Sequence, residues 1–167
     1  MTTRLAAVTE FMLRAAIAAL LFLQAATMFG DRAAKEVIAR HTTSFTVSAE
    51  PVSVTLNVAR GKARLISAAK SAQCTVVLEI EGVTADHPPG FIVAVFAGEH
   101  RVGEVALYVS DQPQTFAFAI DEVVVRALRG GKSLQIRFVP ESGLHGQPAR
   151  PQAPVRISAI SLGIERQ

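Results

Sequence analysis

The strongest constraint on this chain is a run of sixteen residues without a charged side chain, residues 15–30 (AAIAALLFLQAATMFG). Only Gln24 and Thr27 in this run are appreciably polar. As a helix it would be about 24 Å long, slightly short of the roughly 30 Å hydrocarbon core of a bilayer. Residues 11–13 lengthen it if the Arg14 side chain reaches back to the lipid interface. The run therefore predicts a segment that binds membrane lipid.

Two kinds of segment fit this pattern, an uncleaved membrane anchor and a cleaved signal peptide. The small residues near Ala25 are followed by bulky side chains, a poor cleavage site, and helix-forming residues continue through residues 31–40. We therefore favour one uncleaved helix over residues 6–38. A buried core helix is least favoured, because its uniform hydrophobicity would demand a larger core than the rest of the chain can build. The expected division is residues 1–40 as hydrophobic helix and flanks, and residues 41–167 as a second domain.

The charges around the apolar segment bear on its topology. Arg4 and Arg14 precede it, and Arg32, Lys35 and Arg40 follow it, which is nearly a tie under the positive-inside rule. Short N-terminal apolar segments commonly act as signal anchors that leave the following domain outside. The expectation is a single-pass membrane protein with its second domain on the periplasmic or extracellular side.

From residue 41 onward, apolar and polar residues alternate and β-branched residues are frequent, the pattern of half-buried strands. Strands are predicted over residues 43–47, 52–58, 63–66, 74–80, 91–96, 102–109, 115–120, 133–139 and 155–164. One short helix is expected over residues 122–128, with Asp121 at its N-terminal cap. Long helical crossovers are missing, which excludes a nucleotide-binding α/β fold. The sequence predicts a mainly β protein, an antiparallel β-sandwich or jelly-roll-like domain preceded by one N-terminal α-helix.

The charge distribution argues against nucleic-acid binding. The net charge is +3, but the 17 basic residues are scattered along the chain, and there is no Trp and only one Tyr for base stacking. The densest basic group is Arg60, Lys62 and Arg64, which we interpret as one solvated turn. No nucleic-acid partner is therefore expected.

The candidate metal ligands do not form a recognisable pattern. His41, His87, His100 and His145 include no HxH or HxxxH pair, so surface imidazoles are the favoured interpretation. The single cysteine, Cys74, excludes an intramolecular disulfide and a thiolate zinc cluster. It shares a strand face with three apolar residues, which predicts a small buried side chain. No metal site and no cofactor is assigned.

The one carboxylate pair worth weighing is Glu79 and Glu81, which lie on one face of a predicted strand, opposite Leu78 and Ile80. Paired acids can perform general acid–base catalysis. Exposed alternation along a strand explains them more simply, and no serine lies in a GxSxG elbow. No catalytic residue is assigned, and the chain is expected not to be an enzyme.

The order of elements after Thr75 resembles the C-terminal β-domain of tyrosinases and polyphenol oxidases. The resemblance follows five stretches that match the family's strands and strand-to-helix step: residues 78–83 (LEIEGV), 89–96, 102–108, 118–128 (FAIDEVVVRAL) and 136–143 (IRFVPESG). It covers about 90 residues and implies a jelly-roll-like domain that packs over the dicopper domain in that family. The chain departs from the family in lacking the helical copper-binding domain with its six histidines. The resemblance therefore implies no oxidase activity.

Two hypotheses about function remain open. The first is a noncatalytic, membrane-anchored β-domain that acts as an accessory or structural subunit, packing on a protein partner in a membrane complex or on a separate oxidase. Val- and Phe-rich sheet faces and the missing site residues favour it. The alternative is a periplasmic binding or carrier module for a small ligand or copper, with a pocket between its sheets.

Overall fold

The structure is a computed structural model, and it describes residues 35–59, 61–62, 65–66, 74–107, 112–128, 133–142 and 151–166. The chain divides into two compact units, Met1–Ala34 and Lys35–Gln167, and every described residue lies in the second. The lipid-binding segment predicted at residues 15–30 lies outside the described residues. Within the described part of the chain, no helix is both long enough and apolar enough to cross a membrane.

The second unit is mainly β, as predicted, and its two four-stranded sheets are antiparallel. We name them after a central strand. The β4 sheet has the order β1 (Glu36–His41), β10 (Ala159–Arg166), β4 (Cys74–Val83), β7 (Gln114–Ala119). The β5 sheet has the order β3 (Val52–Asn57), β8 (Ser133–Glu141), β5 (Ile92–Ala97), β6 (His100–Val105). A further pair, β2 (Phe45–Val47) and β9 (Val155–Ile157), is also antiparallel.

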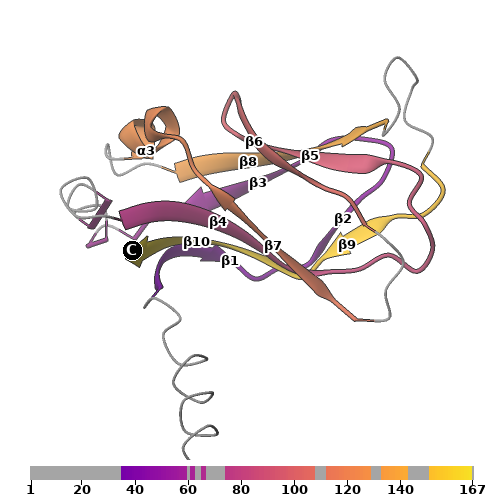
Figure 1. Cartoon of the computed structure of the whole chain (residues 1–167), viewed down its shortest axis with the longest axis horizontal. Helices are drawn as coiled ribbons and strands as arrows, with labels where there is room; N and C mark the ends of the chain where they lie inside the picture. The colour runs from indigo at the N-terminus through magenta and orange to yellow at the C-terminus, as the bar shows by residue number, and fades with distance from the viewer. Residues whose placement is uncertain are drawn as a thin grey trace, which may run out of the picture. The chain divides into compact units, whose positions relative to one another are not determined.

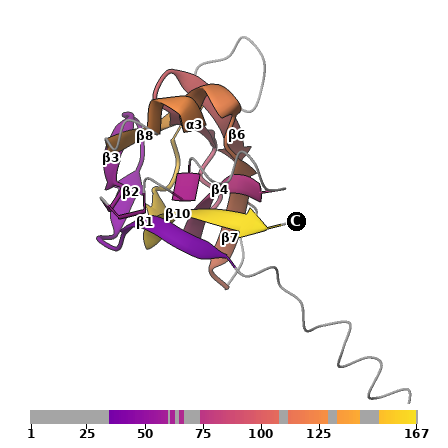
Figure 2. The ribbon, with the colours of Figure 1, turned by 90° about the vertical axis from the view of Figure 1, so that its left-hand side faces the viewer.

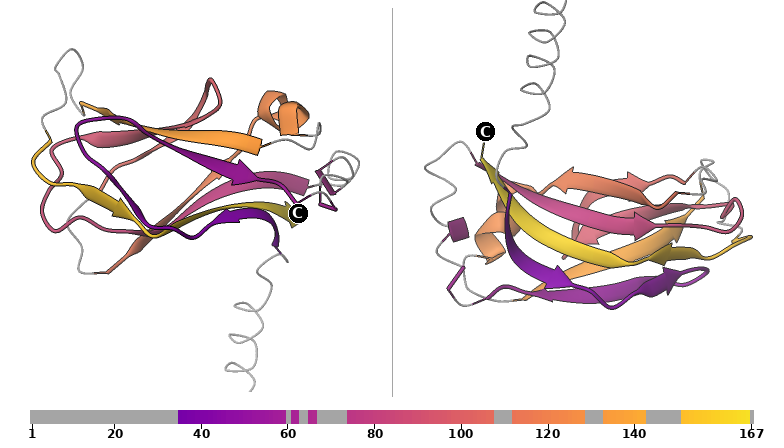
Figure 3. Two further views of the ribbon diagram at one scale, coloured as in Figure 1. Left: turned by 180° about the vertical axis from the view of Figure 1, so that it is seen from behind. Right: turned by 90° about the horizontal axis from the view of Figure 1, so that it is seen from below.

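The two sheets stack on one another as the layers of a β-sandwich (Figures 1 and 2). The strands of the β4 sheet run side by side in Figure 3 (right). Strand β5, expected from its FIVAVF sequence to be central, pairs with β8 on one side and β6 on the other. The sandwich therefore has two inner faces that form the core and two outer faces.

The core lies between the sheets, where alternate residues of each strand point inward. Val76, Leu78 and Ile80 of β4 are at most 4% exposed, and Cys74 packs against the core on the same face. The other inner faces supply fully buried side chains, among them Leu56, Ile136, Phe138, Ile160 and Leu162. Burial of these apolar side chains is the main stabilisation of the fold. The predicted inward alternation in β4 is thus confirmed.

The sheets approach closely where Gly103 of β6 faces Phe118 of β7. A Cβ atom on Gly103 would lie 2.3 Å from Cδ1 of Phe118, so no larger residue fits there without a shift. Phe116 and Phe118 are partly buried against the core and Ile120 is buried, the inward alternation that the sequence predicts. This contact joins an edge strand of one sheet, β6, to an edge strand of the other, β7.

The single predicted helix is also present, as α3 (Glu122–Leu128). The carbonyl oxygen of Asp121 accepts the first helical hydrogen bond, from the backbone N–H of Val125 at 3.0 Å, which places Asp121 at the N-terminal cap. Val124 and Leu128 are buried, whereas Val123 is 57% exposed. One face of α3 therefore covers the core.

Three predictions differ from the structure in the described residues. The single strand predicted over residues 155–164 is two strands, β9 and β10, which belong to different sheets. The C-terminal end of the helix expected over residues 6–38, with helical composition continuing to residue 40, is overturned by β1, which begins at Glu36; residues 6–34 of that helix lie outside the described residues. Pairing with β10, together with burial of Ile38, the unpaired residue of a bulge, and of Ala39 after it, outweighs the helix propensity of this stretch. The strand predicted over residues 63–66 is helical at Leu65–Ile66, where the N–H of Leu65 bonds to the Lys62 carbonyl.

Candidate functional site

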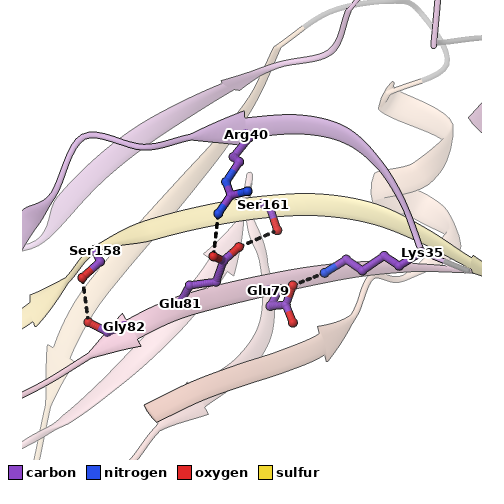
Figure 4. A network of polar contacts seen from close by, with 7 residues as sticks. All are labelled: Lys35, Arg40, Glu79, Glu81, Gly82, Ser158 and Ser161. Atoms are coloured by element: carbon purple, nitrogen blue, oxygen red, sulfur yellow. Dashed lines mark hydrogen bonds and ion pairs between the residues drawn. The ribbon is translucent and has the colours of Figure 1, made fainter. Parts of the chain in front are cut away.

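Glu79 and Glu81, the carboxylate pair that the sequence singles out, lie on the outer face of the β4 sheet. They point away from Leu78 and Ile80, as predicted. Their side chains are only 22% and 30% exposed, however, so they are not the freely solvated pair that simple alternation implies. Both form ion pairs with basic side chains, one from β1 and one from the residue before it. β10 lies between β1 and β4, so these basic side chains extend across it (Figure 4).

The first ion pair joins Lys35 to Glu79. The Lys35 side chain reaches Glu79 by crossing β10 at Gly163, where an added Cβ would lie 2.5 Å from Cε and 2.9 Å from Cγ of Lys35. Glycine at this position leaves room for the aliphatic part of the lysine side chain. The ammonium group then donates a hydrogen bond to Oε2 of Glu79.

The second ion pair joins Arg40 to Glu81. Nη2 of Arg40 lies 2.7 Å from Oε2 of Glu81, while the hydroxyl of Ser161 donates to Oε1 at 3.3 Å. Ser161 is 1% exposed and is the only buried polar residue among those the structure describes. A buried hydroxyl needs a hydrogen-bond partner. Glu81 therefore accepts hydrogen bonds from the buried Ser161 hydroxyl and from Arg40 of the edge strand β1.

Next to this network, β4 bends at Gly82. Gly82 has a φ of +63°, and a Cβ there would lie 2.5 Å from Oγ of Ser158. The Ser158 hydroxyl donates to the Gly82 carbonyl at 3.1 Å, and the pairing of β4 with β7 shifts register between Ile80 and Val83. The bulge requires glycine and ends the regular part of β4 beside Glu81.

The network consists of ion pairs and hydrogen bonds that hold β1 in place. Each carboxylate is occupied by a cation, and Glu81 also accepts from Ser161. Lys62 adds a further tie, since its ammonium donates to the Val37 carbonyl at 2.6 Å and lies 3.6 Å from Glu36. The turn residue Lys62, expected to be solvated, therefore also holds β1. The arrangement fixes β1 to the sandwich.

The histidines are spread over the sandwich. His41 ends β1 and touches Phe45 edge-on, with ring centroids 6.3 Å apart. His87 and His100 are exposed, in a loop and at the start of β6, and His145 lies outside the described residues. Among the residues that the structure describes, no three His, Cys, Asp or Glu side chains gather where a metal ion could bind.

The outer face of the β5 sheet carries a second group of charges. Nη2 of Arg101 on β6 lies 3.1 Å from Glu104 and 3.2 Å from Glu141 on β8, so this guanidinium bridges strands on both sides of β5. Arg137 of β8 lies opposite Phe96 of β5, with its guanidinium carbon 5.1 Å from the ring centroid. That distance is within the range of cation–π contacts.

Sequence reasoning did not find Lys35 and Arg40 as partners of the carboxylates, because it places both in or beside a helix. One signal in the sequence could have identified them. Three successive outward residues of β10 are small, Ala159, Ser161 and Gly163. A central strand with a small outward row leaves room for long side chains from the neighbouring edge strand to lie across it.

The comparisons with known proteins bear on the fold. No protein-family model matches the sequence, and no curated protein matches it. Among solved structures, the chain is similar to latent apple tyrosinase, with 16% identity and a TM-score of 0.49 over 72% of this chain and 27% of that one. A recombinantly expressed latent aurone synthase (polyphenol oxidase) gives 14% identity and a TM-score of 0.48, over 73% of this chain and 26% of that one.

A different kind of protein is similar over most of its own length. The CBM36-1 domain of a multidomain xylanase from the hindgut metagenome of Trinervitermes trinervoides has 12% identity and a TM-score of 0.40, covering 80% of this chain and 91% of that one. The chain spans about a quarter of the two polyphenol oxidases, the family that the sequence resembles.

Proposed function

We propose that this chain is a noncatalytic β-sandwich subunit, held at a membrane by residues 15–30, whose sandwich packs against a protein partner on the periplasmic or extracellular side. One observation carries the proposal: the first residues of the sandwich follow the apolar run 15–30 after only four intervening residues. Lys35, five positions after Gly30, is ion-paired with Glu79, and Glu36 already pairs with Ile164 of β10.

The short connection limits where the sandwich can act. At about 3.5 Å per extended residue, the five steps from Gly30 to Lys35 span less than about 18 Å. A domain tied this closely to lipid suits a subunit that works on other proteins at the same membrane. The engagement of Glu79 and Glu81 in ion pairs supports a structural role for these carboxylates over an acid–base role.

Membrane attachment is tested by alkaline carbonate extraction of membranes that contain the full chain. We expect the chain to stay in the pellet and to be released by detergent, because residues 15–30 are uncharged. The double variant Leu20→Arg, Leu23→Arg should shift it to the supernatant. Val123→Arg, which adds charge at an exposed site on α3, is the matched control and should stay in the pellet. A wild-type chain released by carbonate alone contradicts attachment.

Partnership is tested by chemical cross-linking in the same membranes, followed by detergent extraction and mass measurement. We expect a discrete hetero-oligomer that contains the full chain. A chain that remains monomeric at every cross-linker concentration contradicts the proposal. The carrier alternative makes the opposite prediction: the purified chain would bind copper or a phenol in calorimetric titrations and would form no stable complex with a membrane protein.

A further inference from the structure

Arg137 differs from the other cations of the sandwich in having no carboxylate partner. Each of the other Lys and Arg residues described between positions 35 and 156 lies within 4.0 Å of a carboxylate. These are Lys35, Arg40, Lys62, Arg101, Arg126 and Arg156. The Arg137 guanidinium instead lies against the ring of Phe96. No carboxylate of the described residues therefore forms an ion pair with it.

The hydrogen-bonding capacity of Arg137 is also unused. Its Nε atom is buried and has no acceptor, and it is the only such side-chain atom in the described part of the chain. Buried N–H groups in folded proteins normally have an acceptor. The two Nη groups are not closed off in this way. A guanidinium held by packing, with its outer nitrogens accessible, is ready to accept a ligand from outside.

Arg137 lies beside a short apolar row on a face that also carries Arg101, Glu104 and Glu141. The outward residues of β5 are Ile92 and Phe96, which are partly exposed, and Ala94, which is fully buried; Val139 of β8 lies opposite Ala94. An antiparallel strand with one face in water normally alternates apolar and polar residues, so an apolar outward row is unusual. Aromatic and arginine side chains within an apolar surface are typical of the central residues of protein interfaces.

The carboxylates nearest to this surface are already occupied. Glu104 and Glu141 both pair with Arg101, and neither forms an ion pair with Arg137. We infer that the partner docks on the surface formed by Ile92, Phe96, Arg137 and Val139, which we name the Arg137 surface. The partner supplies an Asp or Glu side chain to the Arg137 guanidinium. This inference rests on the proposed function, since it specifies where the partner binds and which charge it brings.

A photo-cross-linking amino acid tests the location. In membranes that contain the full chain, it is placed at Thr55, an exposed residue of β3 near the Arg137 surface, or at Ala117, an exposed residue on the outer face of the other sheet. We expect irradiation to join a membrane protein to the chain at Thr55 and to give at least about tenfold less product at Ala117. A product at Ala117 alone would leave the proposed function standing and overturn this location.

Two charge variants test the role of Arg137 without removing it. Ser53 is exposed and lies directly opposite Arg137, so Ser53→Glu supplies a carboxylate from within the chain and should leave the fold intact. We expect it to lower the cross-linking yield at Thr55 about tenfold, since about 1.4 kcal/mol of lost affinity changes binding tenfold. Asn57→Glu adds the same charge farther along the same face of β3 and should change the yield less than twofold.

A charge reversal completes the test. Arg137→Glu should abolish the product at Thr55, while Arg126→Glu on α3 should not, and circular dichroism should show both variants folded. Changing the acidic residue found in the cross-linked peptide to Arg should restore the product with Arg137→Glu. A yield at Thr55 that is unaffected by Ser53→Glu, or a contact peptide without an acidic residue, overturns the inference. A chain with no product at either site, and monomeric in membranes, overturns the proposed function as well.

Discussion

The two outer faces of the sandwich hold their cations in opposite ways. On the β4 sheet, Lys35 and Arg40 extend across β10 and end on carboxylates of β4. On the β5 sheet, Arg137 rests on an aromatic ring and ends on no carboxylate among the described residues. On one face each of these cations is ion-paired, and on the other both carboxylates pair with Arg101 and leave Arg137 without an ion-pair contact.

The difference follows from the central strands. The outward residues of β10 from Ala159 to Gly163 are small, so side chains from the edge strand can lie flat across it and reach the next strand. The outward residues of β5 include Ile92 and Phe96, whose bulk supports a guanidinium above the sheet. The size of the side chains in a central strand therefore decides whether long side chains can cross it to a carboxylate or rest above it.

The largest expected effect comes from removing a carboxylate from the outer face of the β4 sheet. Glu81→Ala leaves Arg40 unpaired and the buried hydroxyl of Ser161 without its acceptor. We expect the free energy of unfolding of the detergent-solubilised chain to fall by about 2 kcal/mol in urea titrations. Glu104→Ala breaks an exposed pair on the other face and should cost less than about 1 kcal/mol. Equal losses in the two variants would contradict the comparison.

Replacing each arginine by an apolar side chain of similar length compares the faces directly. Arg40→Met should cost about 1–2 kcal/mol, because it leaves the half-buried Glu81 carboxylate without its cation. Arg137→Met should change stability by less than about 0.5 kcal/mol or increase it, because it removes a buried N–H without an acceptor and keeps the packing on Phe96. Urea titration of both variants measures the difference. A loss at Arg137 as large as that at Arg40 would show that Arg137 serves stability.

Much of the sandwich could be predicted from the sequence because period-two alternation is a local signal. The boundaries of α3 and the inward faces of β4 and β7 follow from residues within each element. Strand β1 could not be predicted in this way. Its residues favour a helix when taken alone, and only the ladder with β10, more than 100 positions away in sequence, makes it a strand.

The same error conceals the charge network. Placing Lys35 and Arg40 in or beside a helix removes the partners of Glu79 and Glu81, which then resemble solvated carboxylates or a catalytic pair. The Arg137 surface was missed for a related reason. Cross-strand neighbours such as Ser53, Arg137 and Phe96 belong to three strands, and their register depends on the assembled sheet.

A smaller loss of stability is expected from substitution of Gly163, which leaves room for Lys35 on the outer face of the β4 sheet. Gly163→Ala places a methyl group against the Lys35 side chain and should displace it from Glu79, at a cost of about 1 kcal/mol. The cost should disappear in a Lys35→Ala background, because the two changes act on one interaction. The double-mutant cycle is measured by urea unfolding. An unchanged cost in that background would mean that Gly163 is needed for the β10 backbone and not for Lys35.

The smallest expected effect sets the scale for both faces. Arg126 and Glu122 form an i, i+4 pair on α3 with side chains 63% and 53% exposed, so water and salt screen it from all sides. Arg126→Gln should cost only about 0.3–0.5 kcal/mol at low ionic strength. That cost should vanish in molar salt, where charges more than about 3 Å apart are screened. The cost of Glu81→Ala should persist in the same salt, because Ser161 and the half-buried carboxylate stay shielded from water. If the stability losses of Arg126→Gln and Glu81→Ala both vanish in molar salt, ordinary surface ion pairs hold the outer face of the β4 sheet. The two outer faces would then differ only in how their charges are paired and not in how deeply they are buried.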